Sequence, residues 1–266
     1  MTEPRKVVIG NAELWLGDCR QLRDQFGKVD ALISDPPYGQ RHKTNVSLKG
    51  GLKTENGSYR INARRRIDNG YHGSDHCTVW PDAIAGDDEP FDPAPWLGIA
   101  PRVLLWGAHR FADRLPPGTW LVWDKVPTGK VRDQGDGEAA WLNDDPPRPM
   151  RLFRLLWDGV CVGSAARDEV TAGQQRVHPT QKPVVLMDWC LAQAGVEPGQ
   201  TALDPYMGAG STGVACARRG IRFVGCEIEP LYFETACERI RAAQEQGDLL
   251  RDILPASKPV QEGLEL

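Results

Sequence analysis

Short apolar segments alternate with stretches of helical periodicity along most of this chain, and this alternation is what most constrains its fold. Several apolar segments lack strict in-and-out alternation, which is typical of strands buried on both faces of a mostly parallel sheet. Strands separated by helices of this length predict an α/β fold with an open, doubly wound, mostly parallel sheet of seven strands. The predicted strands are 12–18, 29–35, 101–107, 119–125, 151–157, 201–204 and 221–227, and the predicted helices are 92–99, 108–115, 183–195, 211–219 and 230–245.

A chain of 266 residues suits one large domain with an elaboration. We assign residues 1–246 to that domain and the proline-containing stretch 247–266 to a peripheral tail. Three polar or turn-rich stretches interrupt the alternation at about 40–80, 127–137 and 163–177, and loops of this length usually carry function. No apolar run approaches the ~20 residues that cross a bilayer, and no secretory signal is visible, so we expect a cytoplasmic protein without membrane contact.

The seven cysteines form no C-x-x-C pair, and several lie within predicted strands or helices. Their odd number and their placement predict reduced core cysteines. His72, His76 and Cys77 form a cluster that could hold zinc, but no fourth ligand is evident nearby. The sequence therefore predicts no metal site.

Charge is segregated along the chain. The formal net charge is −4, but residues 41–72 hold eight Lys or Arg against two acids, a balance of 8 − 2 = +6 that leaves −10 for the remainder. An acidic body with one basic arm suits contact with a polyanion, because phosphate neutralisation is local. A solvated basic loop is the alternative. The basic residues are Arg41, Lys43, Lys49, Lys53, Arg60, Arg64, Arg65 and Arg66.

A glycine-rich turn follows the predicted strand 201–204, and an acid ends that strand. Gly208, Gly210 and Gly213 formally match the dinucleotide fingerprint of a nicotinamide-dependent oxidoreductase. A pyrophosphate-binding site, however, requires its glycines directly at the strand end, whereas here Asp204 comes four residues before the first glycine. A carboxylate in this place suits a cationic ligand, and S-adenosylmethionine carries an ammonium group beside a sulfonium.

A second acid, Glu227, ends the next predicted strand, 23 positions after Asp204. An acid at the tip of the second strand can accept hydrogen bonds from both ribose hydroxyls. The two acids and the glycines together predict a site for S-adenosylmethionine. A plain strand-turn-helix unit with a surface acid is the alternative.

The sequence "DPPY" (35–38) follows another predicted strand, so it lies at the carboxyl edge of the sheet, where open α/β folds bind ligands. Two prolines stiffen the loop and remove two backbone donors, which leaves carbonyl oxygens as acceptors. Asp35 and the Pro36 carbonyl could take the two hydrogens of an exocyclic amino group while Tyr38 stacks on the base. Such bonds make the nitrogen lone pair available for in-line attack on a methyl sulfonium.

These motifs together resemble the amino-group DNA methyltransferases, which modify N6 of adenine or N4 of cytosine. The resemblance rests on "DPPY" (35–38), "DPYMGAGSTG" (204–213), Glu227 in "GCEIEP" and "HPTQKP" (178–183), and it covers most of the chain except 40–80 and the tail. It implies a Rossmann-like methyltransferase sheet, S-adenosylmethionine as cofactor and a DNA-binding insertion. The catalytic tetrapeptide precedes the donor motif, which resembles the circularly permuted β-class order.

The resemblance also implies roles for individual residues. The segment 178–183 closes over the methionine part of the donor, and Asp18 belongs to a segment that lines the donor's adenine. Tyr206 stands where the family usually has Phe, so the ring is kept. The implied catalytic residues are Asp35, Pro36, Pro37 and Tyr38, and the implied donor-binding residues are Asp18, Cys19, His178, Thr180, Lys182, Asp204, Pro205, Tyr206, Gly208, Gly210, Ser211, Thr212 and Glu227.

No Pro-Cys dipeptide is present for covalent attack on carbon 5 of cytosine, so direct transfer is expected. The target base must then be flipped out of the duplex or be single-stranded. Family members with Asp first in the tetrapeptide mostly resemble adenine enzymes and those with Ser cytosine enzymes. We therefore expect methylation of adenine N6, with cytosine N4 as the alternative.

Double-stranded DNA is the expected partner. The eight basic residues would contact phosphates, while Gln40, Asn45, Asn56, Asn62 or an Arg of 64–66 could read base edges. A second copy of the chain in a homodimer and a cognate restriction endonuclease are further candidate partners. The competing functions are an RNA or protein methyltransferase, which should have the reverse motif order, the oxidoreductase, and a catalytically silent DNA-binding module.

Overall fold

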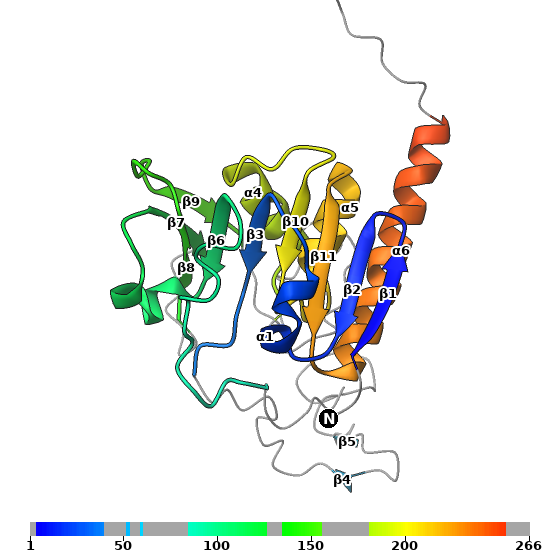
Figure 1. Cartoon of the computed structure of the whole chain (residues 1–266), viewed down its shortest axis with the longest axis horizontal. Helices are drawn as coiled ribbons and strands as arrows, with labels where there is room; N and C mark the ends of the chain where they lie inside the picture. The colour runs from blue at the N-terminus through cyan, green and yellow to red at the C-terminus, as the bar shows by residue number, and fades with distance from the viewer. Residues whose placement is uncertain are drawn as a thin grey trace, which may run out of the picture.

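We describe the fold from a computed structural model that places residues 4–39, 52–53, 59–60, 85–126, 135–155 and 181–253. They form a nine-stranded sheet with helices on its faces and a separate two-stranded ribbon (Figure 1). The sheet contains β1 (Arg5–Ile9), β2 (Ala12–Leu16), β3 (Ala31–Ser34), β6 (Arg102–Trp106), β7 (Thr119–Asp124), β8 (Gly137–Leu142), β9 (Arg151–Arg154), β10 (Thr201–Asp204) and β11 (Arg222–Glu227). The ribbon contains β4 (Leu52–Lys53) and β5 (Tyr59–Arg60), and the α-helices are α1 (Cys19–Leu22), α4 (Val184–Gln193), α5 (Ser211–Arg219) and α6 (Pro230–Ile253).

The strand order across the sheet is β1-β2-β11-β10-β3-β6-β8-β7-β9. The five strands from β2 to β6 in this order are parallel to one another. β1 is antiparallel to β2, β8 is antiparallel to both β6 and β7, and β9 is parallel to β7. All strands except β1 and β8 therefore end at one common edge of the sheet, the carboxyl edge.

The predicted fold class, a mostly parallel α/β sheet, is confirmed, and each of the seven predicted strands is present. Among the described residues, β1 and β8 are the additions to the nine-stranded sheet, and β4 and β5 are the additions outside it. β8 begins at Gly137, where the predicted loop 127–137 was expected to end. β1 lies at the edge of the sheet, antiparallel to β2, and β8 lies between β6 and β7, antiparallel to both. Neither strand changes the order of the five central parallel strands.

The predicted helices 183–195, 211–219 and 230–245 correspond to α4, α5 and α6. The other two predictions are wrong. Residues 92–99 form turns closed by bonds such as Trp96 N to Pro93 O at 2.9 Å, and 108–115 forms two short 3₁₀ helices, Ala108–Arg110 and Ala112–Arg114. Bonds between residues three apart make tighter, shorter elements than an α-helix.

Each face of the sheet packs against a different layer. α4, α5 and α6 cover one face, and α1 with the residues around 91–111 covers the other (Figure 1). Within β3, Ile33 faces the first layer and Leu32 the second, and neither has exposed surface. Two-sided burial explains why these strands read as continuous apolar runs.

Five of the cysteines lie in the described residues, and all five are free and buried, as expected for core cysteines. The candidate zinc cluster of His72, His76 and Cys77 lies outside the described residues. Within the part of the chain that the structure places, no group of three or more His, Cys, Asp or Glu could hold a metal ion. No helix in that same part is long and apolar enough to span a membrane.

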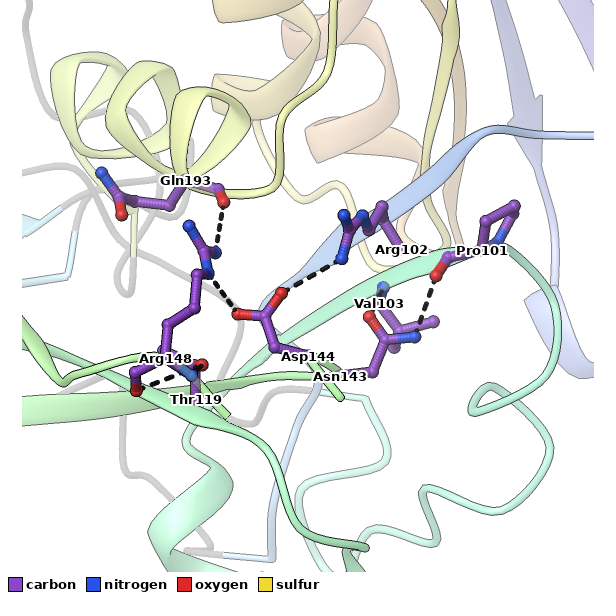
Figure 2. A network of polar contacts seen from close by, with 8 residues as sticks. All are labelled: Pro101, Arg102, Val103, Thr119, Asn143, Asp144, Arg148 and Gln193. Carbon is purple, nitrogen blue, oxygen red and sulfur yellow. Dashed lines mark hydrogen bonds and ion pairs between the residues drawn. The ribbon is translucent and has the colours of Figure 1, made fainter. Parts of the chain in front are cut away.

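Asp144 lies just after β8, at the edge of the sheet opposite the carboxyl edge, and it anchors that edge (Figure 2). Its carboxylate is buried and accepts bonds from Arg102 at 3.1 Å and from Arg148 at 2.7 Å. Arg148 also donates to the Gln193 carbonyl in the last turn of α4 at 2.8 Å, and its backbone N–H donates to Thr119 at 2.7 Å. These bonds join β6, β7 and β8 to α4, and they satisfy a carbonyl that the helix end leaves without a partner.

We expect Asp144→Ala to lower the free energy of unfolding by about 1–3 kcal/mol, because it leaves two arginines without their buried acceptor. Urea unfolding would measure the loss. Asp113→Ala is the control, since that side chain is 81% exposed and lies 3.8 Å from Arg114, and it should change stability by no more than about 0.5 kcal/mol. Equal stability of the two variants would contradict the anchoring role.

Candidate functional site

The predicted catalytic segment and the predicted donor segment meet at the carboxyl edge. β3 and β10 are adjacent parallel strands, with Leu32 paired to Leu203. From β3 the chain crosses to β6 on one side, and from β10 it crosses to β11 on the other side. The site therefore lies where the winding direction reverses, which is where open α/β sheets bind their ligands.

Asp204, the last residue of β10, joins three parts of this edge through its carboxylate. Ser34 at the end of β3 donates its hydroxyl to Oδ1 at 2.6 Å, and Thr212 in the first turn of α5 donates to Oδ2 at 2.6 Å. The backbone N–H of Tyr206 also donates to Oδ1, at 3.2 Å. Burial raises the pKa of Asp204 to about 6, and the hydrogen bonds from Ser34 and Thr212 oppose that rise. Oδ2 keeps capacity for one further donor, such as an ammonium group.

The turn between β10 and α5 is very tight. Gly208 and Gly210 have φ angles of 51° and 77°, in the left-handed region that favours glycine. A Cβ on Gly210 would lie 2.9 Å from the Cβ of Ala236 in α6, so a larger residue does not fit there. Arg239 of α6 donates a hydrogen bond to the Ala209 carbonyl and fixes the turn from behind.

Glu227, the last residue of β11, is held by the backbone. Gly208 N–H donates to Oε2 at 2.9 Å and Glu229 N–H donates to Oε1 at 2.8 Å. Each oxygen keeps a further lone pair, so the carboxylate can still accept two hydroxyl groups. Burial raises the pKa of Glu227 to about 7, against the opposing effect of its backbone hydrogen bonds.

Asp18 and Cys19 lie beside Glu227, because the neighbouring Gly17 N–H donates to the Glu227 carbonyl at 2.8 Å. Asp18 caps α1 by accepting the Arg20 backbone N–H at 3.0 Å, and its side-chain bonds with the Arg20 guanidinium hold the pKa of Asp18 below its usual value. Cys19 is buried in the hydrophobic cluster against which Tyr206 packs. These contacts assemble the predicted donor side from β2, β10 and β11.

Asp35 belongs to a line of alternating charges at the end of β3. Its Oδ2 accepts a hydrogen bond from Lys182 Nζ at 2.5 Å. The same ammonium group lies 2.9 Å from Oε2 of Glu138, which in turn pairs with Lys125. The Lys182 side chain is only 8% exposed, so these interactions form largely out of water.

The other oxygen of Asp35, Oδ1, is buried and has no hydrogen-bond partner among the described residues. A buried carboxylate oxygen without a donor is costly, and such an atom is an open acceptor. Burial raises the pKa of Asp35, while the positive charge of Lys182 opposes that rise. An amino group that donates to Oδ1 would complete the carboxylate.

Tyr38 is the aromatic surface next to this acceptor. Its ring lies against the backbone of Gly107, which has a φ of 69°, and a Cβ there would be 2.2 Å from the ring. The guanidinium carbon of Arg110, an exposed residue, lies 5.7 Å from the centroid of the Tyr38 ring. A glycine at position 107 is therefore required for Tyr38 to reach its place beside Asp35.

The structure brings most of the predicted site residues together, with 18–19, 204–212 and 227 on the donor side and 35–38 beside them. Lys182, which the resemblance implies for donor binding, contacts Asp35 and Glu138 with its ammonium group. His178, Thr180 and most of the predicted DNA-binding residues lie outside the described residues. Of the latter, Lys53 and Arg60 are placed by their backbone alone, in the ribbon of β4 and β5.

Sequence reasoning missed Ser34, Gly107, Lys125 and Glu138. Ser34 directly precedes Asp35, and Gly107 ends a predicted strand, so position alone could have drawn attention to both. No local pattern could have linked Glu138 to the site, because Glu138 reaches the site only through Lys182, which contacts Asp35 from 147 positions away in the sequence.

Comparisons with known proteins find similarity to DNA methyltransferases. A family model described as DNA methylase matches residues 122–238. The Type II methyltransferase M.XycI of Xanthomonas campestris pv. cyanopsidis is 23% identical over 283 residues, which cover 90% of this chain and 90% of that protein. The Type II methyltransferase M2.DpnII of Streptococcus pneumoniae is 41% identical over 100 residues, which cover 35% of this chain and 36% of that protein.

Among solved structures, the PvuII DNA methyltransferase (cytosine-N4-specific) aligns with a TM-score of 0.50 at 13% identity, over 87% of each chain. A complex of M1.HpyAVI with SAM aligns with a TM-score of 0.49 at 19% identity, over 86% of this chain and 98% of that chain. The PvuII alignment supports the same fold across most of the chain.

The raised pKa values of the two donor-side acids predict that S-adenosylmethionine affinity falls on acidification. Glu227 holds a proton below about pH 7 and Asp204 below about pH 6. S-adenosylmethionine, which needs both acids as carboxylates, must displace these protons when it binds. Since each pH unit below a pKa costs a factor of about ten, Kd should rise about tenfold or more between pH 8 and pH 6. Isothermal titration calorimetry measures this directly.

Glu227→Gln should weaken donor binding at pH 8 and flatten its pH dependence, whereas Glu234→Gln, in an exposed surface ion pair with Arg5, should change neither. A Kd that stays constant from pH 8 to pH 6 in the unsubstituted protein would contradict the roles given to the two acids.

Proposed function

We propose that this chain, which belongs to the S-adenosylmethionine-dependent amino-group DNA methyltransferases, transfers the methyl group directly to N6 of adenine in a base flipped out of the duplex. The observation that carries the proposal is the open acceptor Oδ1 of Asp35, next to a donor turn tied to the same strand end by the bond from Ser34 to Asp204. The circularly permuted order, with the catalytic segment before the donor segment, also supports a DNA enzyme over the RNA and protein methyltransferases.

The chemistry follows from the acceptors around the amino group. Asp35 Oδ1 accepts one amino hydrogen and the Pro36 carbonyl the other, which directs the nitrogen lone pair toward the donor side. The bound donor supplies an electrophilic methyl group on a sulfonium. As the lone pair forms the new C–N bond, the C–S bond breaks and sulfur keeps its electron pair. The surplus N–H proton then passes to Asp35, whose raised pKa suits it as the acceptor.

Tyr38 would hold the flipped base by stacking, as aromatic side chains do with extruded bases. Its ring is supported by the Gly107 backbone, so it offers a rigid surface. Asp204 and Thr212 would hold the methionine end of the donor, and Glu227 its ribose. These roles place the reacting nitrogen and the methyl group between β3 and β10.

For the DNA itself, we propose that residues 40–80 form a basic insertion and that 127–137 and 163–177 are recognition loops of the same domain. The described residues that precede these stretches, Gly39, Val126 and Leu155, follow β3, β7 and β9, which all end at the carboxyl edge. A common attachment edge supports a DNA-binding surface around the catalytic site. Action on DNA would place the enzyme in the cytoplasm.

Two further partners belong to the same proposal. Both M.XycI and M2.DpnII are named Type II methyltransferases, which supports a restriction-modification role with a cognate endonuclease. A homodimer is the other candidate assembly.

Methylation of cytosine N4 is the second candidate function. The acceptor pair of Asp35 and Pro36 suits either exocyclic amino group, and the solved PvuII neighbour is named cytosine-N4-specific. Asp rather than Ser in the first position of the tetrapeptide favours adenine.

Base identity can be decided by expressing the chain in a host without DNA methylation. Long-read sequencing and mass spectrometry of the nucleosides should then find N6-methyladenine within one recognition sequence. N4-methylcytosine would replace the adenine proposal by the second candidate, and an absence of both modifications would contradict DNA methylation by this chain.

We expect Asp35→Ala to reduce methyl transfer by at least about 100-fold, because it removes both the amino-group acceptor and the proton acceptor. S-adenosylmethionine binding should change little, since Asp35 lies outside the donor side. Radiolabelled methyl transfer and calorimetry on one preparation test both statements. Near-normal transfer by the variant would refute the catalytic assignment.

Charge reversal of Arg64, Arg65 and Arg66 should weaken duplex binding and reduce the slope of log K against log salt by about 1 for each lost phosphate contact. Fluorescence anisotropy at several salt concentrations measures that slope. Charge reversal of the exposed Lys28, just before β3, and Arg241, on α6, is the control and should leave the slope unchanged. Unaltered DNA affinity in the first variant would remove the insertion from the DNA-binding surface.

A further inference from the structure

Glu138 lies at the catalytic edge although no motif includes it. β8 runs antiparallel to the central strands, so its first residues lie where the parallel strands end. Glu138 is its second residue, with a side chain 18% exposed, and it stands opposite Lys182 and Lys125. Its carboxylate is therefore shared between two ammonium groups beside Asp35.

Lys182 is the link between the two acids. Its ammonium group lies 2.5 Å from Asp35 Oδ2 and 2.9 Å from Glu138 Oε2, and it also lies 5.9 Å from the centre of the Trp106 ring. An ammonium group has three donors. Glu138 Oε2 accepts no hydrogen bond within the described residues, so it is the charge of Glu138 that attracts the ammonium group to one side of Asp35. Asp35 Oδ1 consequently stays without a partner.

Without the charge of Glu138, Asp35 would be the one acid among the described residues within ion-pair distance of Lys182. A lysine ammonium on a flexible stem moves readily toward the remaining negative charge, and it could then engage both oxygens of Asp35. The acceptor needed by an amino group would be lost even though Asp35 itself is unchanged.

We infer that Glu138 is a positioning residue that acts through Lys182 to keep one oxygen of the Asp35 carboxylate open for the amino group of the target base. This inference rests on the proposed catalytic role of Asp35.

A role for Glu138 as the final proton acceptor is disfavoured by its charge environment. The positive charges of Lys182 and Lys125 overcome burial and lower the pKa of Glu138 to about 2. Burial instead raises the pKa of Asp35. A proton taken from the amino group therefore stays on Asp35 rather than moving to Glu138.

The same charges set the pH dependence of the reaction. Asp35 must be a carboxylate, so the rate falls as pH drops through its pKa. Removal of the negative charge at position 138 lowers that pKa, both directly and by leaving Lys182 to Asp35 alone, so the acid limb moves to lower pH. Within the described residues, the titratable and charged groups that face Asp35 or its loop are Tyr38, Arg110, Lys125, Glu138, Lys182, Cys190 and Asp204, and His109 faces Glu138.

Glu138→Gln tests the inference, with Glu138→Asp as the charge-conserving variant and Glu234→Gln as the control for loss of a glutamate. Single-turnover methyl transfer should fall about 10- to 100-fold in Glu138→Gln, because misplacement of an acceptor costs rates of this order. Its acid limb should move to lower pH while the Kd for S-adenosylmethionine stays within about twofold. Glu138→Asp should restore the position of the limb and part of the rate.

A merely structural role would lower the melting temperature and the rate without moving the acid limb, and that result would overturn the inference. Unchanged rate and limb in a folded Glu138→Gln protein would overturn it as well. Asp35→Ala, measured in parallel, separates the two levels. If it keeps full activity the proposed site is wrong, whereas if it loses activity while Glu138→Gln does not, only the role of Glu138 is wrong.

Discussion

The hydrogen bond from Ser34 to Asp204 is the contact on which the site depends. It joins the ends of two adjacent parallel strands, one leading into the predicted catalytic segment and the other into the glycine-rich turn. Because Thr212 and the Tyr206 backbone donate to the same carboxylate, a single buried acid sets the relative position of the two loops and of the first turn of α5. The proposed direct transfer between two bound molecules needs that position to be held within a fraction of an ångström, and buried groups joined by several hydrogen bonds provide such rigidity.

The charged groups beyond Asp35 are expensive to bury, and their arrangement explains why they are tolerated. Lys182 and Lys125 alternate with Asp35 and Glu138, so each charge has an opposite neighbour. Buried ion pairs contribute little net stability compared with apolar packing, but removal of one member leaves an uncompensated charge. A cluster of this kind at the end of parallel strands is more easily understood as a device that sets the state of one carboxylate than as a stabilising element.

Much of the fold could be predicted because strands buried on both faces leave a clear apolar signature, and each of the seven predicted strands is present. β8 was missed because it begins directly after a turn-rich stretch and contains Glu138 and two alanines at its start. That the predicted donor residues lie together could be predicted because their acids and glycines are close in sequence and lie at strand ends. The contacts of Lys182 could not, since its position in a motif says which segment it belongs to but not which acid its long side chain reaches.

The order of the predicted catalytic and donor segments along the chain does not change how they meet in the sheet, and the reason is topological. β3 and β10 are neighbours in the sheet although the chain reaches one long before the other, and each carries its functional residues just past its carboxyl end. Either order of the two halves would bring the same two strand ends together, provided that both strands keep their direction. What the order does change is the location of the connections. After β9, the last strand of the first half, the chain must return to α4 and β10 through residues 156–180. This connection ends at Lys182. The ion pair with Asp35 is therefore formed by the residue at which the connection between the two halves ends.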